Sequence, residues 1–356
     1  MTQTSSAGAA PAHPDPIFVW RPEPDAPFET MTSSLLVESA RVRDQPNLTI
    51  AIPTYRRPEL IRETIASVLA QTDLDGVELL IVDDDPSSDG FGPLLTALPA
   101  LRDISFRYYR NAANLGLFGN WNTCLALAHG TWITVLNDDD LLDPAFVATI
   151  RQTLAADPTI NAAACSLRFL DQRRGAGDAA APVPRAEKIR NLFRFRLADT
   201  RRLRPAQMFF GSIAGSGLGL VVRTEIIRAL GGYRAADYPS ADYFFMTRLA
   251  RYHHFVQLRA PLAISRVDDN VSSRPETQLG FLRCQARLQD ALLENGVVPQ
   301  WWRRIQASTM GIALRHTNRY WGQDFQREDV ARAISTRISF RRLRAVRWYR
   351  LLIGAI

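Results

Sequence analysis

The sequence has few cysteines and lacks any long uncharged apolar run. Its three cysteines, Cys124, Cys165 and Cys284, are odd in number and far apart. This argues against a disulfide framework or a thiolate metal site and fits a reducing compartment. No stretch approaches the ~18 uncharged apolar residues of a membrane-spanning helix, and the N-terminus lacks the basic start and apolar core of a secretory signal. We therefore expect a cytoplasmic protein.

Positive charge predominates in the composition. The chain has 43 Lys and Arg against 36 Asp and Glu, which gives a net charge of +7. An anionic partner is therefore expected, whether a nucleotide, a phospholipid surface or a nucleic acid. With 356 residues, of which 46% are hydrophobic, the chain can form one large domain and a smaller one.

The first 46 residues predict a disordered N-terminal arm. They are rich in Pro, Ala, Ser and Thr, and such a segment buries too little apolar surface to order itself. Regular structure is predicted to begin with a strand at Leu48–Ile52. Pro58 suits the first position of the helix that follows, because apolar residues recur there with helical spacing.

The central part of the chain alternates strands with helices. Further strands are predicted at Val77–Val82 and Ile104–Tyr109, which indicates a parallel sheet flanked by helices. Acidic clusters, Asp83–Asp85 and Asp138–Asp140, follow two of the strands. Because parallel strands place their carboxyl ends at one edge of the sheet, we expect both clusters to meet in one crevice.

The second cluster ends the segment Thr131–Asp140, in which a short apolar strand leads into Asn137 and three aspartates. Three adjacent carboxylates repel one another unless they face water or a cation, and oxygen ligands suit Mg²⁺ or Mn²⁺. An acidic turn before the helix start at Asp143-Pro144 is the alternative from these residues alone.

Two further segments bear on the site. Gly215–Gly219 does not complete the dinucleotide fingerprint GxGxxG, because Leu220 stands where the last glycine is needed. Asp242 stands near the start of a predicted helix. Taken alone, an aspartate in that position indicates a helix cap.

Residues 271–356 predict a helical region with a basic tail. The stretch from Ala331 to Ile356 has no acidic residue and several arginines, and arginines and apolar residues interleave around a single helical projection of it. A clean amphipathic membrane helix is therefore not expected. Contact with an anionic membrane and a solvated or protein-packed helix both remain open. We predict no nucleic-acid partner, since no recognised module accompanies the charge.

Taken together, these segments resemble the family 2 glycosyltransferases, inverting enzymes of the GT-A fold that use nucleotide-diphospho-sugars. The matching residues, in chain order, are Ile50–Arg57, Leu80–Gly90, Asn114–Gly116, Asn120, Gly130, Thr134–Asp140, Gly231–Tyr233 and Asp242. The resemblance implies an α/β, Rossmann-like and mostly parallel sheet flanked by helices over residues 47–270, with a C-terminal helical extension.

The resemblance also implies roles for particular residues. Asp84 would accept a hydrogen bond from the base, Asp138 would face the ribose, and Asp139 or Asp140 would bind Mg²⁺ or Mn²⁺. Asp242 would be the general base, although Ala241 stands where the family often has a second acid. The other residues expected to bind the donor are Pro53, Thr54, Tyr55, Arg57, Asn114, Gly116 and Asn120.

The expected function is transfer of one sugar from a nucleotide-diphospho-sugar, with UDP or dTDP favoured, to a hydroxyl of a glycan or lipid-linked oligosaccharide. A cytoplasmic enzyme of cell-surface polysaccharide biosynthesis, peripheral at the inner face of the membrane, would fit. A carboxylate base makes a sugar hydroxyl nucleophilic, and a cation offsets the charge of the leaving diphosphate. The alternatives are a sugar nucleotidyltransferase and a non-catalytic glycan- or membrane-binding protein on this fold.

Overall fold

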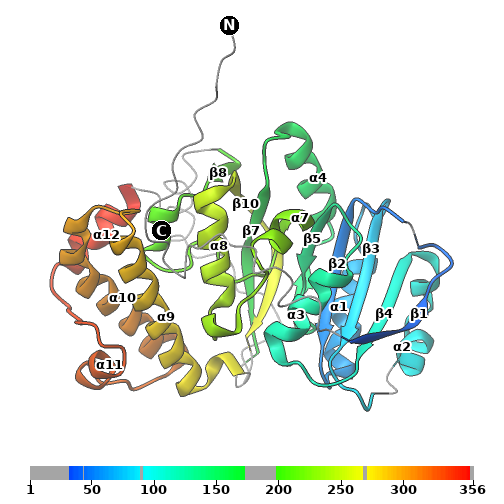
Figure 1. Ribbon diagram of the computed structural model, residues 1–356, viewed down its shortest axis with the longest axis horizontal. Coiled ribbons are helices and arrows are strands. Elements are labelled where there is room, and N and C mark those ends of the chain that lie inside the picture. Colours follow the sequence, from blue (N-terminus) through cyan, green and yellow to red (C-terminus); the bar gives the residue numbers. More distant parts are fainter. Residues whose placement is uncertain (1–31, 43, 89–90, 173–197, 268–270, 353–356) are drawn as a thin grey trace, which may run out of the picture.

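The computed structural model describes residues 32–42, 44–88, 91–172, 198–267 and 271–352. One twisted sheet runs through the molecule, and the C-terminal helices lie at the end opposite the N-terminal strands (Figure 1). Two predicted features lie partly outside the described residues: the N-terminal arm, over residues 1–31, and the basic tail, over its last four residues.

The sheet has ten strands in the order β1-β4-β3-β2-β5-β9-β7-β10-β6, with β8 paired to β10. The strands are β1 Ser33–Glu38, β2 Leu48–Thr54, β3 Val77–Asp83, β4 Ser105–Asn111, β5 Trp132–Val135, β6 Leu141–Leu142, β7 Ala162–Asp171, β8 Thr200–Arg202, β9 Leu220–Arg223 and β10 Phe255–Val267. The neighbouring strands β4, β3, β2 and β5 are parallel, as are β7 and β10. Strand β9 joins these two parallel groups in antiparallel fashion.

The strand β1 corrects the prediction of a disordered arm up to residue 46. It pairs antiparallel with β4 at the edge of the sheet. Most of its side chains are exposed, so the segment carries little of the apolar patterning by which a strand is recognised. Backbone pairing with β4, a contact remote in sequence, orders it instead.

Helices cover both faces of the sheet. Their bounds are α1 Pro58–Leu69, α2 Phe91–Ala97, η1 Pro99–Asp103, α3 Gly116–Leu127, α4 Phe146–Ala156, α6 Pro205–Met208, α7 Thr224–Ala229, η3 Ala235–Asp237 and α8 Ala241–Tyr252. Alternate residues of β2 and β3 pack into two cores: Ile52 and Ile81 lie in the core that includes α1, whereas Ala51 and Leu80 lie in the core with α3 and α8. Burial on both faces explains the nearly continuous apolar sequence of these strands.

The C-terminal region is helical, as predicted. Its elements are η4 Val271–Ser273, α9 Pro275–Glu294, η5 Gln300–Trp302, α10 Arg303–Trp321, α11 Arg327–Ala333 and α12 Leu343–Leu352. The basic tail therefore comprises the end of α11, a non-helical segment and α12, so a projection of the whole tail as one helix is not valid. Helix α12 on its own is one-sided and buries Leu343 and Val346. None of the helices that the structure describes is long and apolar enough to cross a bilayer.

Candidate functional site

The two acidic clusters meet at the carboxyl end of β2. This strand lies between β3 and β5, and its last residue, Thr54, contacts both clusters. The Thr54 carbonyl accepts a hydrogen bond from the Asp84 amide at 2.9 Å, and the Thr54 hydroxyl donates to Asp138 at 2.8 Å. The predicted convergence is confirmed, and Thr54 is its central residue.

Arg57 binds the second cluster from the loop after β2. Its Nη1 donates to Asp138 at 3.1 Å and to Asp139 at 2.6 Å. Burial acts to lower the pKa of Arg57, but the charges of the two carboxylates outweigh it and the pKa is raised. Of the neighbouring predicted residues, Pro53 lies within β2 and is buried, whereas Tyr55 is exposed. The Arg57 guanidinium thus offsets part of the negative charge of this cluster.

Asp140 faces into the protein. Its carboxylate accepts hydrogen bonds from the Arg266 amide of β10 and from the Asn137 side chain, both at 3.0 Å. Burial, followed by the charge of Asp139, raises the pKa of Asp140. One oxygen thus joins the turn after β5 to β10, and the other is bound within that turn.

A divalent ion fits this cluster through one carboxylate. Within the described part of the chain, no three His, Cys, Asp or Glu side chains are grouped so as to hold a metal. Mg²⁺, however, commonly takes only one or two carboxylates together with waters and substrate phosphates. The Asp139 carboxylate is bound by Arg57 through one oxygen, whereas both oxygens of Asp138 and Asp140 have protein partners. The chemistry of the donor set therefore favours Asp139 as the ligand.

Asp84 lies at the start of α3. It is buried, and it accepts hydrogen bonds from the amides of Leu115 and Gly116, each at 2.9 Å, and from Asn111 at 2.7 Å. Burial raises the pKa of Asp84, and these donors partly offset that rise. The carboxylate thus satisfies backbone N–H groups that a helix start leaves without partners. This structural role was not predicted, because the sequence does not show which helix start faces the end of β3.

The other predicted residues of α3 lie at the same edge of the sheet. Asn120 donates to the carbonyls of Val82 at 3.0 Å and Thr54 at 3.4 Å, which links the ends of β2 and β3. Asn114 accepts a hydrogen bond from Gly116 at 3.1 Å, and Gly116 has a φ of +72°, which favours glycine. These residues shape the floor of the site, and donor binding by them stays a prediction.

Asp242 lies in the first turn of α8. Its carboxylate accepts hydrogen bonds from the Gly217 amide at 3.0 Å and from its neighbour Tyr243 at 2.8 Å. Burial raises the pKa of Asp242, and the two backbone donors lower it in part. A methyl group on Gly217 would lie 3.5 Å from the Asp242 Cβ and 3.7 Å from the Trp121 ring. The glycine-rich segment that failed as a dinucleotide fingerprint therefore holds this carboxylate.

Aromatic side chains that were not predicted as site residues lie between α3 and α8. The Phe118 ring lies 5.4 Å from that of Trp121 and 6.1 Å from that of Tyr238. Trp121 also meets Tyr233 at 4.8 Å. In the sequence, the only signal for them is the aromatic content of the segment that opens α3, and such residues are equally typical of an ordinary hydrophobic core.

Comparison with known proteins shows similarity to glycosyltransferases. Residues 49–214, just under half of the chain, match the model described as Glycosyl transferase family 2. A relative from Campylobacter jejuni, described as a GalNAc(5)-diNAcBac-PP-undecaprenol beta-1,3-glucosyltransferase, is 34% identical over 108 residues, which cover 30% of this chain and 34% of the relative. The matched segments span between 13% and 62% of the length of the first curated relatives.

Solved structures share the fold. TarS residues 1–349 from S. aureus, in complex with UDP-GlcNAc, has a TM-score of 0.58 at 14% identity, covering 87% of this chain and 89% of that one. The mannosyltransferase PcManGT from Pyrobaculum calidifontis, in complex with GDP-Man and Mn²⁺, has a TM-score of 0.52 at 17% identity, covering 89% and 88%. The predicted GT-A fold with a helical C-terminal region is thereby confirmed.

Proposed function

Because residues 49–214 match the model of glycosyltransferase family 2, we propose that this chain transfers a single sugar, with inversion, from a nucleotide-diphospho-sugar to a glycan hydroxyl. The observation that carries the proposal is the meeting of both acidic clusters at Thr54. The transferase domain would comprise residues 47–270, together with the edge strand β1.

Asp242 is proposed as the general base. Burial raises its pKa, and a carboxylate of raised pKa is a better proton acceptor. Asp242 takes the proton of the acceptor hydroxyl, whose oxygen forms a bond to the anomeric carbon. The bond from that carbon to the diphosphate oxygen breaks, and the electron pair leaves with the diphosphate. A single displacement of this kind inverts the anomeric centre.

The donor is proposed to bind at the carboxyl end of β2. Exposed Tyr55 and half-exposed Arg57 face this edge, and a guanidinium suits phosphate oxygens. A divalent ion, Mg²⁺ or Mn²⁺, would be held by Asp139 with the donor's phosphates and, when bound, supplies charge that offsets the leaving diphosphate. UDP or dTDP is the proposed leaving nucleotide.

The experiment is thermal stabilisation by UDP, dTDP, GDP and CMP, each with Mn²⁺, with Mg²⁺ or with EDTA. A ligand at about 100 times its Kd adds ~2.7 kcal/mol, which is visible as a melting shift. We expect a metal-dependent shift with one nucleoside diphosphate. A chain that none of these nucleotides stabilises would instead be a binding protein on a transferase fold.

A lipid-linked acceptor is proposed, handled at the inner face of the cell membrane. The C-terminal helices expose Trp348 by 67% and Trp301 by 49%, next to exposed arginines on α12. Tryptophan suits a membrane interface, and arginines attract anionic lipid. The relative that acts on an undecaprenol-linked substrate, as its description says, supports the same class of acceptor.

The membrane surface is tested by sedimentation with phosphatidylcholine vesicles that contain phosphatidylglycerol. Replacing Arg344 and Arg347 by glutamine removes ~1 kcal/mol each, so binding should weaken by about thirtyfold. The matched control replaces Arg327 and Arg332, which are exposed but pair with acidic neighbours. Equal loss in both double variants, or no binding by the wild type, would refute a surface at α12.

A further inference from the structure

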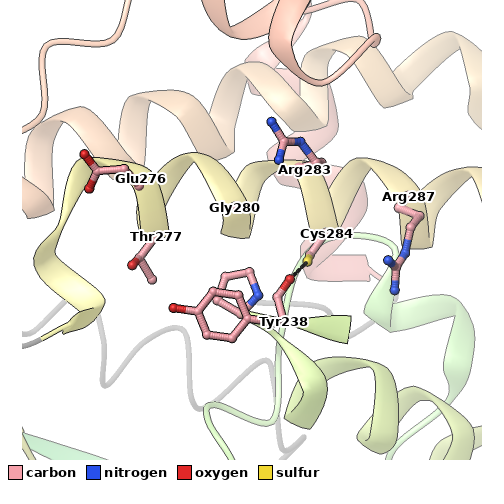
Figure 2. A pocket seen from close by; sticks show the side chains of 8 residues that line it. Tyr238, Glu276, Thr277, Gly280, Arg283, Cys284 and Arg287 are labelled. Carbon is pink, nitrogen blue, oxygen red and sulfur yellow. Dashed lines mark hydrogen bonds between the residues drawn. The ribbon is translucent and has the colours of Figure 1, made fainter. Parts of the chain in front are cut away.

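A cavity of about 220 Å³ lies between the turn that precedes α8 and one side of α9 (Figure 2). It is lined by Tyr238, Pro239, Glu276, Thr277, Gly280, Arg283, Cys284 and Arg287. In Figure 2 the Tyr238 ring and Thr277 lie on the same side of α9. None of the residues predicted to bind the donor is among those that line it.

The cavity lies close to Asp242 along the chain. Tyr238 precedes that carboxylate by four residues, and the turn between them is fixed by a hydrogen bond from the Ser240 amide to the Asp237 carbonyl at 2.8 Å. The Tyr238 ring also meets Phe118 at 6.1 Å. Phe118 in turn contacts Trp121, which adjoins the Gly217 that binds Asp242, so a series of aromatic contacts leads from the cavity toward the proposed base.

The wall of the cavity is held in place before any ligand arrives. A methyl group on Gly280 would lie 2.9 Å from Pro239, so α9 has a glycine where the turn packs on it. The Cys284 thiol contacts the Tyr238 carbonyl at 3.5 Å, and Arg287 pairs with Asp237. Tyr238 nevertheless remains 53% exposed. A fixed and exposed aromatic ring suits binding, because little conformational freedom is lost when a ligand stacks on it.

The size and lining of the cavity fit one sugar ring. A cavity of ~150 Å³ holds benzene, so 220 Å³ has room for a six-membered ring with hydroxyl groups but not for a disaccharide. The tyrosine ring offers a face for the C–H side of a pyranose. Thr277 and the exposed Glu276 and Arg283 offer polar groups at the rim. Among the described residues, Arg283 pairs with no carboxylate and makes only a long contact of 3.5 Å to the Ala333 carbonyl.

We propose that this cavity binds a pyranose ring of the acceptor, with Tyr238 as its stacking platform. The inference rests on the proposed glycosyltransferase function. It assigns the acceptor to the cavity between the turn before α8 and α9, whereas the donor is proposed to bind at the end of β2. The acceptor is thereby a glycan that carries a pyranose next to its reacting hydroxyl, and not a bare polyol or lipid phosphate.

The test is saturation-transfer NMR with p-nitrophenyl pyranosides of glucose, galactose, N-acetylglucosamine and glucuronic acid. We expect at least one to bind the wild type, Tyr238→Phe to retain binding, and Tyr238→Leu to weaken it about tenfold. Tyr252→Ala is the matched control, because Tyr252 is similarly exposed, at 42%, at the far end of α8. Melting temperatures check that each variant is folded.

The outcomes separate the cavity from the proposed reaction. Binding that is unchanged in Tyr238→Leu, or lost equally in Tyr252→Ala, overturns the assignment, as does a wild type that binds none of the four probes. Nucleotide stabilisation should be the same in Tyr238→Leu as in the wild type. If no nucleotide stabilises the wild type while a pyranoside still needs the Tyr238 ring, the transferase function fails and the sugar site stands.

Discussion

Replacing Asp242 by asparagine should lower turnover by ~10²-fold or more while making the protein more stable at neutral pH. The substitution keeps the shape of the side chain and leaves one oxygen to accept a backbone hydrogen bond from Gly217 or Tyr243. It removes the proton acceptor, which contributes ~10²–10⁴-fold to the rate. Binding of the donor nucleotide should be unaffected, since Asp242 is not among the residues proposed to bind the donor.

The gain in stability follows from the direction of the pKa shift. Burial raises the pKa of Asp242 in the folded protein, so the folded state prefers the protonated carboxyl. The stabilisation from that preference is present below the unfolded-state pKa of ~3.9 and is lost as the pH rises through the folded-state pKa. The asparagine variant does not titrate, so its stability relative to wild type should increase across that interval and remain higher at pH 7.

The gain in stability is limited by the hydrogen bonds that the carboxylate accepts. The asparagine oxygen can replace one carboxylate oxygen, and losing the other bond costs about 1 kcal/mol. A net gain therefore requires that the cost of burying the charge exceed that loss. Active-site residues commonly lower the stability of the folded protein in this way, because activity requires them.

The assays are urea unfolding between pH 4 and 8 and release of nucleoside diphosphate from the donor sugar, for which water is a slow acceptor. Asp157→Asn is the control: the Thr159 hydroxyl holds the pKa of Asp157 below its usual range, so its stability change should have the opposite sign. An Asp242→Asn variant with wild-type turnover would refute the role of base. If the same variant is less stable at pH 7 and matches wild type only in acid, the burial argument is wrong.

Two further predictions concern the donor side. Asp84→Ala should lower the free energy of unfolding by ~1–3 kcal/mol, because the amides at the start of α3 and the Asn111 side chain lose their acceptor. Urea unfolding measures this change. Loss of nucleotide binding with unchanged stability would mean that Asp84 binds the nucleotide base and does not stabilise the helix. Arg57→Gln should tighten the binding of Mn²⁺ in the absence of nucleotide, measured by calorimetry, because Asp139 loses its positively charged partner. Arg56→Gln is the control and should not tighten it, because Arg56 pairs with Asp85. Equal Mn²⁺ affinities in the two variants would show that Arg57 does not compete with the metal.

The sequence by itself determined the alternation of strands and helices and the order of the motifs. Buried strands such as β2 and β3 carry apolar residues on both faces, and Pro58 marks a helix start. The acidic runs after two parallel strands were enough to predict that they converge, because strand direction fixes which ends share an edge. These are signals of local sequence or of a rule of topology.

Only the tertiary structure decided what each polar side chain contacts. Asp84 bonds to a helix start 32 residues further on, Asp140 to a strand 126 residues away, and Asp242 to the amide of Gly217. Strand β1 exists because β4 offers it a backbone edge, and the Tyr238 cavity because α9 packs across the turn. In each case the partner is remote in sequence, and the free energy of the contact depends on a distance that residue type and spacing do not encode.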